Sequence, residues 1–543
     1  MRTDPEARRP AAPALALTLT LALVLTLALA LVNCGRGQDQ RQARALAGTV
    51  VVGIAEAPES LDPRVGTSVA SYRLHQLLYN QLVTQDAEGR LVPDLAESWE
   101  ERIDGEGLEA RQTWTFRLRR GVRFHDGRPL SADDVVYTFH SLLAPGFASH
   151  KRAAFADVVE VSAEAPATVV FTLAKPQPWF LANLGAVGIV PRGFPADGSR
   201  APVGTGPFSL RSRDGSRRFE LAANDNYFRG RPSVRSLVLR VIPDDTTRAL
   251  ELMHGSVDLV INDMAVSAVE SLRERPRLEV LTAPGLSYEY IGINHRHPDL
   301  GRRRVRQAIA HAIDRGEIIR EFLGGLARPA VGPLMPRLWA LPVEFRGYDY
   351  DPQRAEDLLE AAGYYDPDGP GPEPRLRLVL KCSSRHVSRD LAVIFRQQLA
   401  RVGIAVEIRP LEFQTYYADI IAGNFELFQL RWVGIIDPHF FGSAFHSTSV
   451  PGSDGGRERG SFNRGRYANP EVDRLIERAE REREAAERWR VVAELQQLLS
   501  EDLPYVDLWY RDNFAVFRSD LEGVELTLNA SFAPLYRLHY RDR

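Results

Sequence analysis

The chain has 543 residues, which is more than one hydrophobic core usually supports, so we expect at least two packed units. Its apolar content of 44% and its charged content of 26% are ordinary for a globular protein. The formal net charge of −3 argues against a general nucleic-acid-binding protein, for which a strong positive excess is typical.

The first segment of the chain predicts export. An Arg-Arg pair precedes an uninterrupted small and apolar run, Ala14–Val32, and this run stops just before Cys34. A basic start, an apolar stretch and a processing site are typical of a secretory signal. The alternative is an uncleaved membrane anchor, because the apolar run nearly reaches spanning length. We therefore interpret residues 1–33 as a signal peptide and the polar residues 34–48 as a tether, with the folded part outside the cytoplasmic membrane.

The two cysteines have different predicted roles. The end of the apolar run resembles a bacterial lipoprotein lipobox, in which Cys34 becomes the lipidated first residue, although Asn33 stands where Gly, Ala or Ser is usual. A lipidated cysteine cannot form a disulfide, so Cys382 would be a free thiol. No histidine or acid lies close to Cys382 in the sequence, so we expect a buried thiol at a strand end rather than a nucleophile.

Short strands separated by turns dominate the first part of the folded chain. Ser131 and Asp134 resemble a capping box, with Asp in place of the usual Glu or Gln, before a further apolar stretch. Gly255 follows an expected helix as its terminating glycine. The expected strands are 49–54, 114–118, 122–124, 158–163, 168–173, 219–222, 236–242 and 257–261, and the expected helices are 68–82 and 246–254.

From about Tyr288 the pattern becomes a more regular alternation of helices and apolar strands. Such alternation implies covered and largely parallel strand pairing. Asp351-Pro352 opens one helix as its N-cap and first residue, and Gly363 closes it. The other expected helices are 305–313, 390–402, a helix that begins at 469–470, and 484–499; the expected strands are 376–380, 404–408, 427–432, 506–509 and 513–517.

The segment 426–447 is the candidate for ligand binding. It opens as an apolar strand that ends at Trp432, and Asp437-Pro438 then interrupts any regular sheet. Three phenylalanines and two histidines follow on what we expect to be a loop or a short helix. Aromatic and a few polar groups on a rigidly held loop are typical of a small-molecule cleft. The alternative is a strand end that is packed into a large core.

The sequence contains no recognisable catalytic motif. It has no phosphate-binding loop, no Gly-x-Ser-x-Gly elbow and no His-Glu-x-x-His pattern. His295 and His297 could share one side of a strand and bind a metal ion, or form a surface pair in a loop. By residue type, Asp437, His439 and His446 are a better metal candidate, although their spacing does not itself create ligand geometry. We predict no cofactor.

Several motifs occur in one order between about residue 49 and residue 543. They are Leu61-Asp62-Pro63 and the stretches 91–99, 114–127, 132–136, 202–208, 305–309, 350–352 and 467–473. This order resembles family 5 of the solute-binding proteins of ABC transporters, the dipeptide-, oligopeptide- and nickel-binding extracytoplasmic lipoproteins. No single motif is decisive, but their common order is highly specific.

The resemblance implies an α/β fold of the type II periplasmic-binding-protein kind, with two lobes joined by a hinge. It places lobe I in residues 49–87, 201–287 and 506–543, an extra domain on it in 88–200, and lobe II in 288–505. The hinge crossings would lie near 284–294 and 502–509. The expected function is an extracytoplasmic receptor that closes on a peptide or peptide-like ligand and delivers it to the permease subunits of an ABC importer. The expected protein is a monomer without a nucleic-acid partner.

Two rival functions remain at this point. One is a receptor of the same family for a metal chelate or a sugar-type ligand. The other is an envelope hydrolase that uses an acid such as Asp437, and this reading predicts a second acid or base within hydrogen-bond reach. No partner for such a pair is evident in the sequence.

The resemblance also suggests ligand-binding residues. Trp432 matches the strand tryptophan of peptide-binding relatives, but Ile435 stands where these relatives carry the aspartate that binds the peptide ammonium group. Asp437 matches instead the acid before proline that occurs across members with different ligands. Because a buried ammonium group without an anion is costly, this departure from the family pattern argues against a ligand with a free peptide N-terminus.

Three further residues complete the predicted site. Arg385 lies near the position where dipeptide binders place the arginine that holds the ligand carboxylate, with an exposed loop arginine as the alternative. Tyr288 and Tyr290 would face the cleft from the hinge strand, with core packing as the alternative. Trp432 would either stack on the ligand or plug the end of its strand.

Overall fold

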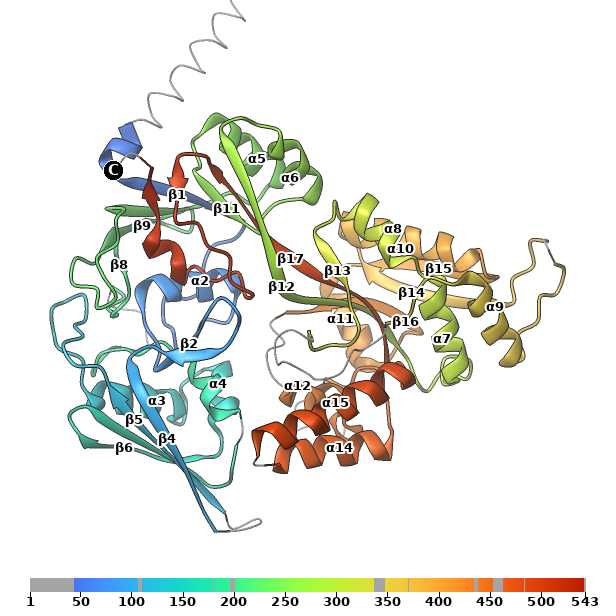
Figure 1. Ribbon diagram of the computed structural model, residues 1–543, viewed down its shortest axis with the longest axis horizontal. Coiled ribbons are helices and arrows are strands. Elements are labelled where there is room, and N and C mark those ends of the chain that lie inside the picture. Colours follow the sequence, from blue (N-terminus) through green and yellow to red (C-terminus); the bar gives the residue numbers. More distant parts are fainter. Residues whose placement is uncertain are drawn as a thin grey trace, which may run out of the picture.

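A computed structural model describes residues 43–105, 110–177, 179–195, 201–335, 347–369, 371–433, 438–452, 462–482 and 484–541. The predicted residues Cys34 and Asp437 lie outside the described residues. The described residues form two lobes that lie side by side, with a further domain below the first lobe in the view of Figure 1. None of the described helices is both long and apolar enough to cross a membrane.

One mixed sheet continues through both lobes, with strands β12 and β17 at its centre. Its order is β15-β14-β16-β12-β17-β11-β1-β10-β9-β8, and β13 pairs with β17 outside this path. After Tyr288, the expected parallel pairing is confirmed for β14 with β15 and β16, whereas β12 pairs antiparallel with both β16 and β17. In the first part of the chain, β1 also pairs in parallel with β10 and β11. The strands are β1 (Thr49–Ile54), β8 (Phe208–Asp214), β9 (Arg218–Ala223), β10 (Ser236–Val241), β11 (Leu259–Ile261), β12 (Leu278–Ile293), β13 (Ala327–Pro329), β14 (Leu376–Ser383), β15 (Ile404–Leu411), β16 (Leu427–Trp432) and β17 (Tyr505–Arg518).

The long antiparallel strands β12 and β17 connect the lobes. One half of this pair runs from Leu278 opposite Arg518 to Ala283 opposite Asn513, and the other half begins at Ser287 opposite Arg511. The register breaks between Ala283 and Ser287, so the ribbon is irregular where it passes from one lobe to the other. The sequence predicted two separate strands, 506–509 and 513–517, and the structure joins them into β17. The exact lobe boundaries stay predictions.

Lobe I surrounds the first part of this sheet. Its elements besides the strands are α2 (Val69–Leu78), α5 (Asp245–His254), α6 (Val266–Arg273), the 3-10 helix η6 (Ala533–Arg537), and the short strands β18 (Leu521–Glu522) and β19 (His539–Tyr540). Gly255 ends α5 in the left-handed conformation, as predicted. Helix α2 ends at Leu78, four residues before the predicted end. The Leu78 carbonyl accepts a hydrogen bond from the backbone N–H of Gly206, at 3.0 Å, where a continuing helix would use it internally. A Cβ at Gly206 would lie 2.5 Å from the Leu77 carbonyl oxygen, so only glycine fits this crossing.

The extra domain is built on the four-stranded antiparallel sheet β4-β5-β7-β6. Its elements are β3 (Leu91–Pro93), β4 (Ala96–Asp104), β5 (Arg111–Leu118), α3 (Ala132–Leu143), η2 (His150–Phe155), β6 (Val158–Ala165), β7 (Thr168–Leu173) and α4 (Phe180–Leu184). Strand β2 (Val83–Gln85), at the end of the first segment of lobe I, pairs with β3. The predicted capping box of Ser131 and Asp134 is confirmed at the start of α3. The predicted strand 122–124 is wrong, because the tight turn that follows leaves only one isolated bridge, between Arg123 and Pro129.

Lobe II covers the other part of the sheet with helices. They are α7 (Arg303–Ala312), α8 (Arg315–Glu317), the π-helical turn η3 (Ile318–Phe322), α9 (Pro352–Ala361), α10 (His386–Ala400), α11 (Phe413–Ala422), α12 (His439–Phe445), η5 (Ser447–Ser449), α14 (Pro470–Arg481) and α15 (Ala485–Asp502). The predicted Asp351 N-cap of α9 is confirmed, and α10 begins four residues before its predicted start. Cys382 is free and buried near the end of β14, as predicted, and burial raises the pKa of its thiol to about 11.

Candidate ligand-binding site

A cavity of about 610 Å³ lies where the two lobes and the extra domain meet. Lobe I supplies most of its lining, including α2, the end of β11 and the segment 528–532. Lobe II supplies Arg385, Arg431 and Val433, and the extra domain supplies Ala182, Gly185 and Ala186. A volume of this size is typical of a small-molecule site.

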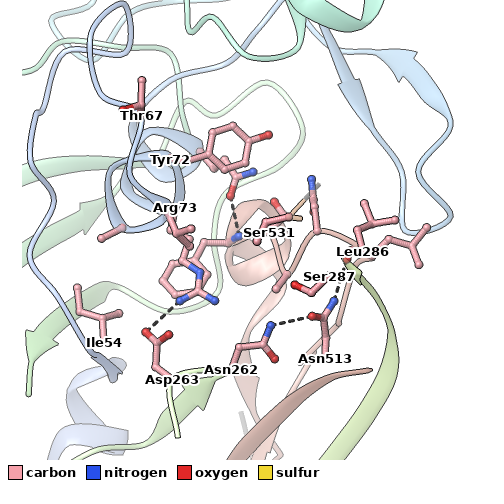
Figure 2. Close-up of a pocket in the computed structure, with 18 of the residues that line it drawn as sticks. Ile54, Thr67, Tyr72, Arg73, Asn262, Asp263, Leu286, Ser287, Asn513 and Ser531 are labelled. Carbon is pink, nitrogen blue, oxygen red and sulfur yellow. Dashed lines mark hydrogen bonds and ion pairs between the residues drawn. The ribbon is translucent and has the colours of Figure 1, made fainter. Parts of the chain in front are cut away.

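The lobe I side of the cavity contains a buried ion pair. Arg73 on α2 lies 3.0 Å from the Asp263 carboxylate, as Figure 2 shows, and its other terminal nitrogen donates to the Ile261 carbonyl. Asp263 also accepts a hydrogen bond from the backbone N–H of Ala55, at 3.1 Å. These bonds join α2, β11 and the segment after β1 into one surface, so the position of Arg73 is fixed before any ligand arrives.

Two asparagines connect this surface to the hinge strand (Figure 2). The side-chain amide of Asn262 donates to the Asn513 side chain at 2.7 Å, and the Asn262 oxygen accepts from the Phe514 backbone N–H. Asn262 adopts a positive φ of 60°, a conformation that asparagine tolerates better than most residues. Asn513 donates in turn to the carbonyls of Thr527 and Leu528, both at 2.9 Å. The hinge strand and the C-terminal segment therefore share one hydrogen-bond network at the cavity.

The lobe II side of the cavity is basic. Arg385 stands at the N-terminal boundary of α10, and Arg431 stands on β16 directly opposite Glu289 of β12. The Glu289 carboxylate is already engaged, because it accepts from Trp509 Nε1 at 2.9 Å and from Arg511 Nε at 2.8 Å. Burial lowers the pKa of Arg431, and repulsion by Arg511 and Arg385 acts in the same direction, against the attraction of Glu289. Two guanidinium groups thus lie near one another at the cavity wall.

Trp432 lies behind this wall and does not line the cavity. Successive side chains of a strand point to opposite faces, so Arg431 and Val433 face the cavity while Trp432 faces the interior of lobe II. Its indole packs against Phe440, at a ring-centroid distance of 5.0 Å. The guanidinium group of Arg464 makes a cation–π contact with it, 4.4 Å from the ring centroid. Trp432 therefore supports the wall, and its contact with a ligand stays a prediction.

Tyr288 and Tyr290 are also interior residues, which matches the core-packing alternative. Both side chains are fully buried, and Tyr290 stacks on Tyr505 with 4.0 Å between ring centroids. The hydroxyl group of Tyr288 donates to the buried carboxylate of Asp507. The cavity is lined instead by Ser287, next to Tyr288. A direct role of the two tyrosines in ligand binding stays a prediction.

Of the four predicted ligand-binding residues that the structure describes, Arg385 is the one that lines the cavity. Its neighbour in the site, Arg431, was not predicted, and neither was Arg73, Asn262 or Asn513. The available signal for Arg73 was a charged residue within a helix whose other positions are mostly buried. The positions of the two asparagines at the lobe junction depend on strand pairing between residues about 250 apart, which a local pattern does not specify.

Among the predicted metal ligands, His295, His297 and His446 have other partners, and Asp437 lies outside the described residues. His295 Nε2 lies 3.3 Å from the Pro504 carbonyl oxygen, whereas His297 Nε2 lies 3.8 Å from the Glu426 carboxylate. The Nδ1 atom of His446 interacts with the backbone N–H and the hydroxyl group of Thr448. Within the described ranges, no group of three or more histidines, cysteines and acids is placed to hold a metal ion.

Comparison with known proteins gives consistent results. A model of the family described as "Bacterial extracellular solute-binding proteins, family 5 Middle" matches residues 90–452. The oligopeptide-binding protein AppA of Bacillus subtilis (strain 168) is 27% identical over 497 residues, which cover 88% of this chain and 88% of AppA. Heme-binding protein A of Haemophilus influenzae (strain ATCC 51907 / DSM 11121 / KW20 / Rd) is 29% identical over 507 residues, which cover 88% of this chain and 89% of the relative.

The fold is similar to a solved structure of the first relative. The structure of Bacillus subtilis AppA in complex with a nonapeptide matches with a TM-score of 0.70 and 25% sequence identity. This match covers 91% of the present chain and 98% of the AppA chain. The comparison supports the two-lobed arrangement over nearly the whole chain.

Proposed function

Because the chain belongs to family 5 of the bacterial extracellular solute-binding proteins, we propose that it captures a peptide or peptide-like ligand between its lobes and delivers it to an ABC permease. The observation that carries this proposal is the cavity shared by lobe I, lobe II and the extra domain. A ligand that contacts both lobes favours the closed arrangement, because those contacts are made together only when the lobes meet.

Arg385 is the residue of this site that we assign to an anionic group of the ligand. It lines the cavity, and within the described part of the chain it has no carboxylate partner. An arginine side chain presents paired donors that match a carboxylate in a bidentate geometry. This role agrees with the position that the family resemblance implies for a carboxylate-binding arginine.

A binding function without catalysis is the most economical reading of the site. Members of the family are binding proteins rather than enzymes, and the described charged residues at the cavity form no evident acid–base pair beyond the Arg73–Asp263 ion pair. The rival ligand class is a metal chelate, because one relative is a heme-binding protein. Cavity residues of the kinds that bind metal ions directly are few, and a chelate would be held through its organic part.

We place the folded part outside the cytoplasmic membrane, in keeping with the extracellular family. The lipobox-like end of the N-terminal apolar run supports lipidation at Cys34. Metabolic labelling with a fatty-acid analogue tests this: the wild-type chain should carry the label, and a Cys34→Ser variant should not.

The function is tested by identifying what the purified protein carries. Native mass spectrometry should show a small molecule bound in one copy, and tandem mass spectrometry after unfolding should identify it as a peptide or a peptide-like compound. Arg385→Gln should reduce occupancy, while Arg111→Gln, at an exposed arginine of β5 away from the cavity, should not. A heme or another metal chelate in place of a peptide would support the rival ligand class, and turnover of a bound ester or amide would support an enzyme.

A further inference from the structure

The charged residues that line the cavity fall into two sets. Among the described residues, five charged side chains line it: Glu56, Arg73, Asp263, Arg385 and Arg431. Arg73 and Asp263 neutralise each other through their 3.0 Å ion pair. The other three have no hydrogen-bond or ion-pair partner for their charged groups within the described residues. The described part of the lining therefore presents one negative charge and two positive charges without partners.

The unpaired charges are separated by lobe. Glu56 belongs to lobe I, where it follows β1 and directly succeeds Ala55, whose N–H donates to Asp263. Arg385 and Arg431 belong to lobe II. Glu56, Arg385 and Arg431 are all exposed to solvent within the cavity, so their charged groups are accessible to a ligand that enters it. Each of them attracts a ligand group of the opposite charge.

The apolar part of the lining is also shared between the lobes. Val69, at the start of α2, is 51% exposed, and Val433, next to Arg431, is 60% exposed. Both valines line the cavity. Contact between these valines and the uncharged part of a ligand removes apolar surface from water, which is favourable.

We infer that the ligand is a short zwitterion that bridges the lobes, with its ammonium group at Glu56 of lobe I and its anionic groups at Arg385 and Arg431 of lobe II. This inference rests on the proposed function and names the charge pattern of its ligand. A peptide with a free N-terminus and an acidic last residue carries one positive and two negative charges, which complements the three unpaired groups. Glu56 supplies the anion that is missing at Ile435, the position where peptide-binding relatives carry an aspartate.

The arrangement links ligand charge to closure. A ligand that lacks the ammonium group satisfies only lobe II, and a ligand that lacks the carboxylates satisfies only lobe I. Only the zwitterion satisfies both lobes at once, so it should favour the closed form most strongly. Charge-assisted contacts of this kind change affinity by about 10- to 100-fold each.

The test is a thermodynamic cycle between Glu56 and the ammonium group of a probe peptide. Affinities of Ala-Ala-Glu and of its N-acetylated form are measured by isothermal titration calorimetry with the ligand-free full chain. The same two probes are measured with Glu56→Gln and with Glu97→Gln, a control at an exposed carboxylate of β4 that does not line the cavity. Thermal unfolding of each variant verifies folding.

We expect acetylation to weaken binding about 10- to 100-fold in the wild-type chain and in Glu97→Gln, but by less than about threefold in Glu56→Gln. Ala-Ala-Gln, the neutral counterpart, should bind more weakly than Ala-Ala-Glu, and Arg431→Gln should remove this preference. An equal cost of acetylation with and without Glu56, while the free peptides bind, would overturn the inference and leave the receptor function standing. Failure of every free and blocked peptide to bind would overturn both.

Discussion

The indole of Trp179 lies against the imidazole of His439, with 6.2 Å between their ring centroids. Trp179 belongs to the extra domain and His439 begins α12 of lobe II, so this contact joins parts of the molecule that the hinge strands do not connect (Figure 1). The guanidinium group of Arg488, on α15, lies 5.8 Å from the Trp179 ring. Trp179 is only 8% exposed, so these contacts lie in a largely buried place.

This contact should hold the lobes together in the absence of ligand, and Trp179→Ala should weaken it. The lost ring removes an aromatic pair and a cation–π contact, which together are worth about 1–3 kcal/mol. We expect a larger radius of gyration for the ligand-free variant in small-angle X-ray scattering, and a severalfold lower affinity for the ligand.

The matched control is Trp99→Ala, at a half-buried tryptophan of β4 that packs within the extra domain. It should lower thermal stability without changing the scattering curve. Identical scattering of Trp179→Ala and the wild-type chain would show that the contact does not hold the lobes together.

Gly285 sits at the register break of the hinge ribbon, and its replacement should disturb the relation of the lobes. A Cβ atom there would lie 2.5 Å from the Arg511 carbonyl oxygen and 2.7 Å from the Asn513 side-chain oxygen. Because the first of these atoms is backbone, Gly285→Ala must move one strand against the other. We expect a loss of about 1–3 kcal/mol in the free energy of unfolding, measured by denaturant titration.

Gly316→Ala is the control for this change, because a Cβ at Gly316 would meet its nearest atom at an ordinary 3.4 Å. It should leave both stability and ligand affinity nearly unchanged. If Gly285→Ala behaved like the control, the close approach at the hinge would have no energetic consequence.

The sequence specified the elements of lobe II better than it specified the site. Helix caps such as Asp351 and apolar runs such as 404–408 are local signals, and the structure forms α9 and β15 there. The local sequence did not show which face of β16 Trp432 occupies. A large aromatic residue suits either face of a strand that is covered on both sides. Arg431, the neighbour that faces the cavity, would have been the better choice.

Lobe I illustrates a second limit of the sequence. Its cavity residues come from distant segments, and Asn262 meets Asn513 only because β11 pairs with β17. Neither asparagine belongs to a motif, so no spacing in the sequence relates them. Arg385 could be predicted because a family resemblance gave a position at the end of a strand, where binding residues often occur.

The buried Arg464 should be essential for the wall of the cavity, although it does not line it. Its guanidinium group lies 4.4 Å from the Trp432 ring and donates to the hydroxyl groups of Tyr290 and Tyr417, at 3.3 and 3.0 Å. Arg464→Lys keeps the charge but loses the planar stacking and one of the donors. We expect it to destabilise the protein by about 1–3 kcal/mol in denaturant titration and to weaken ligand binding.

The comparison variant for Arg464 is Arg211→Lys, at an exposed position of β8. This change should be neutral. A fully stable Arg464→Lys chain with unchanged ligand affinity would show that a point charge suffices beneath Trp432.

Stability should depend on pH through His75, which is buried on α2 between lobe I and the extra domain. Its Nε2 atom lies 2.9 Å from the Ser60 carbonyl oxygen and serves as donor there. Burial, and then repulsion by Lys151, lowers the pKa of His75 to about 3 from 6.5, against weaker opposing effects of Ser60 and Glu59. The folded state therefore keeps His75 neutral at a pH where the unfolded chain protonates it.

Acidification should therefore destabilise the folded state through His75. Stability from the neutral His75 is complete above its unfolded pKa, and it is lost as the pH falls below about 6.5 towards 3. Between about pH 7 and pH 5 the loss is about 2 kcal/mol for one such histidine. His295, with a pKa lowered to about 3 mainly by burial, acts in the same direction, whereas Asp507, with a pKa raised to about 6 by burial, acts in the opposite direction. Lys151, with a pKa lowered to about 8 by burial, is protonated in both states throughout this window.

The difference between the wild-type chain and His75→Gln isolates one contribution. The variant keeps a donor near Ser60, but it should be less stable at pH 7 because it replaces a buried, packed side chain. Because its side chain cannot be protonated, it should lose less stability between pH 7 and pH 5. Urea titrations at the two pH values measure both quantities, and the variant's loss should be smaller than that of the wild-type chain by about 2 kcal/mol. Because His295 and Asp507 are unchanged in the variant, their effects cancel in this difference. Equal losses in the two proteins would mean that His75 stays accessible to protons in the folded state, contrary to its burial beneath the segment around Ser60.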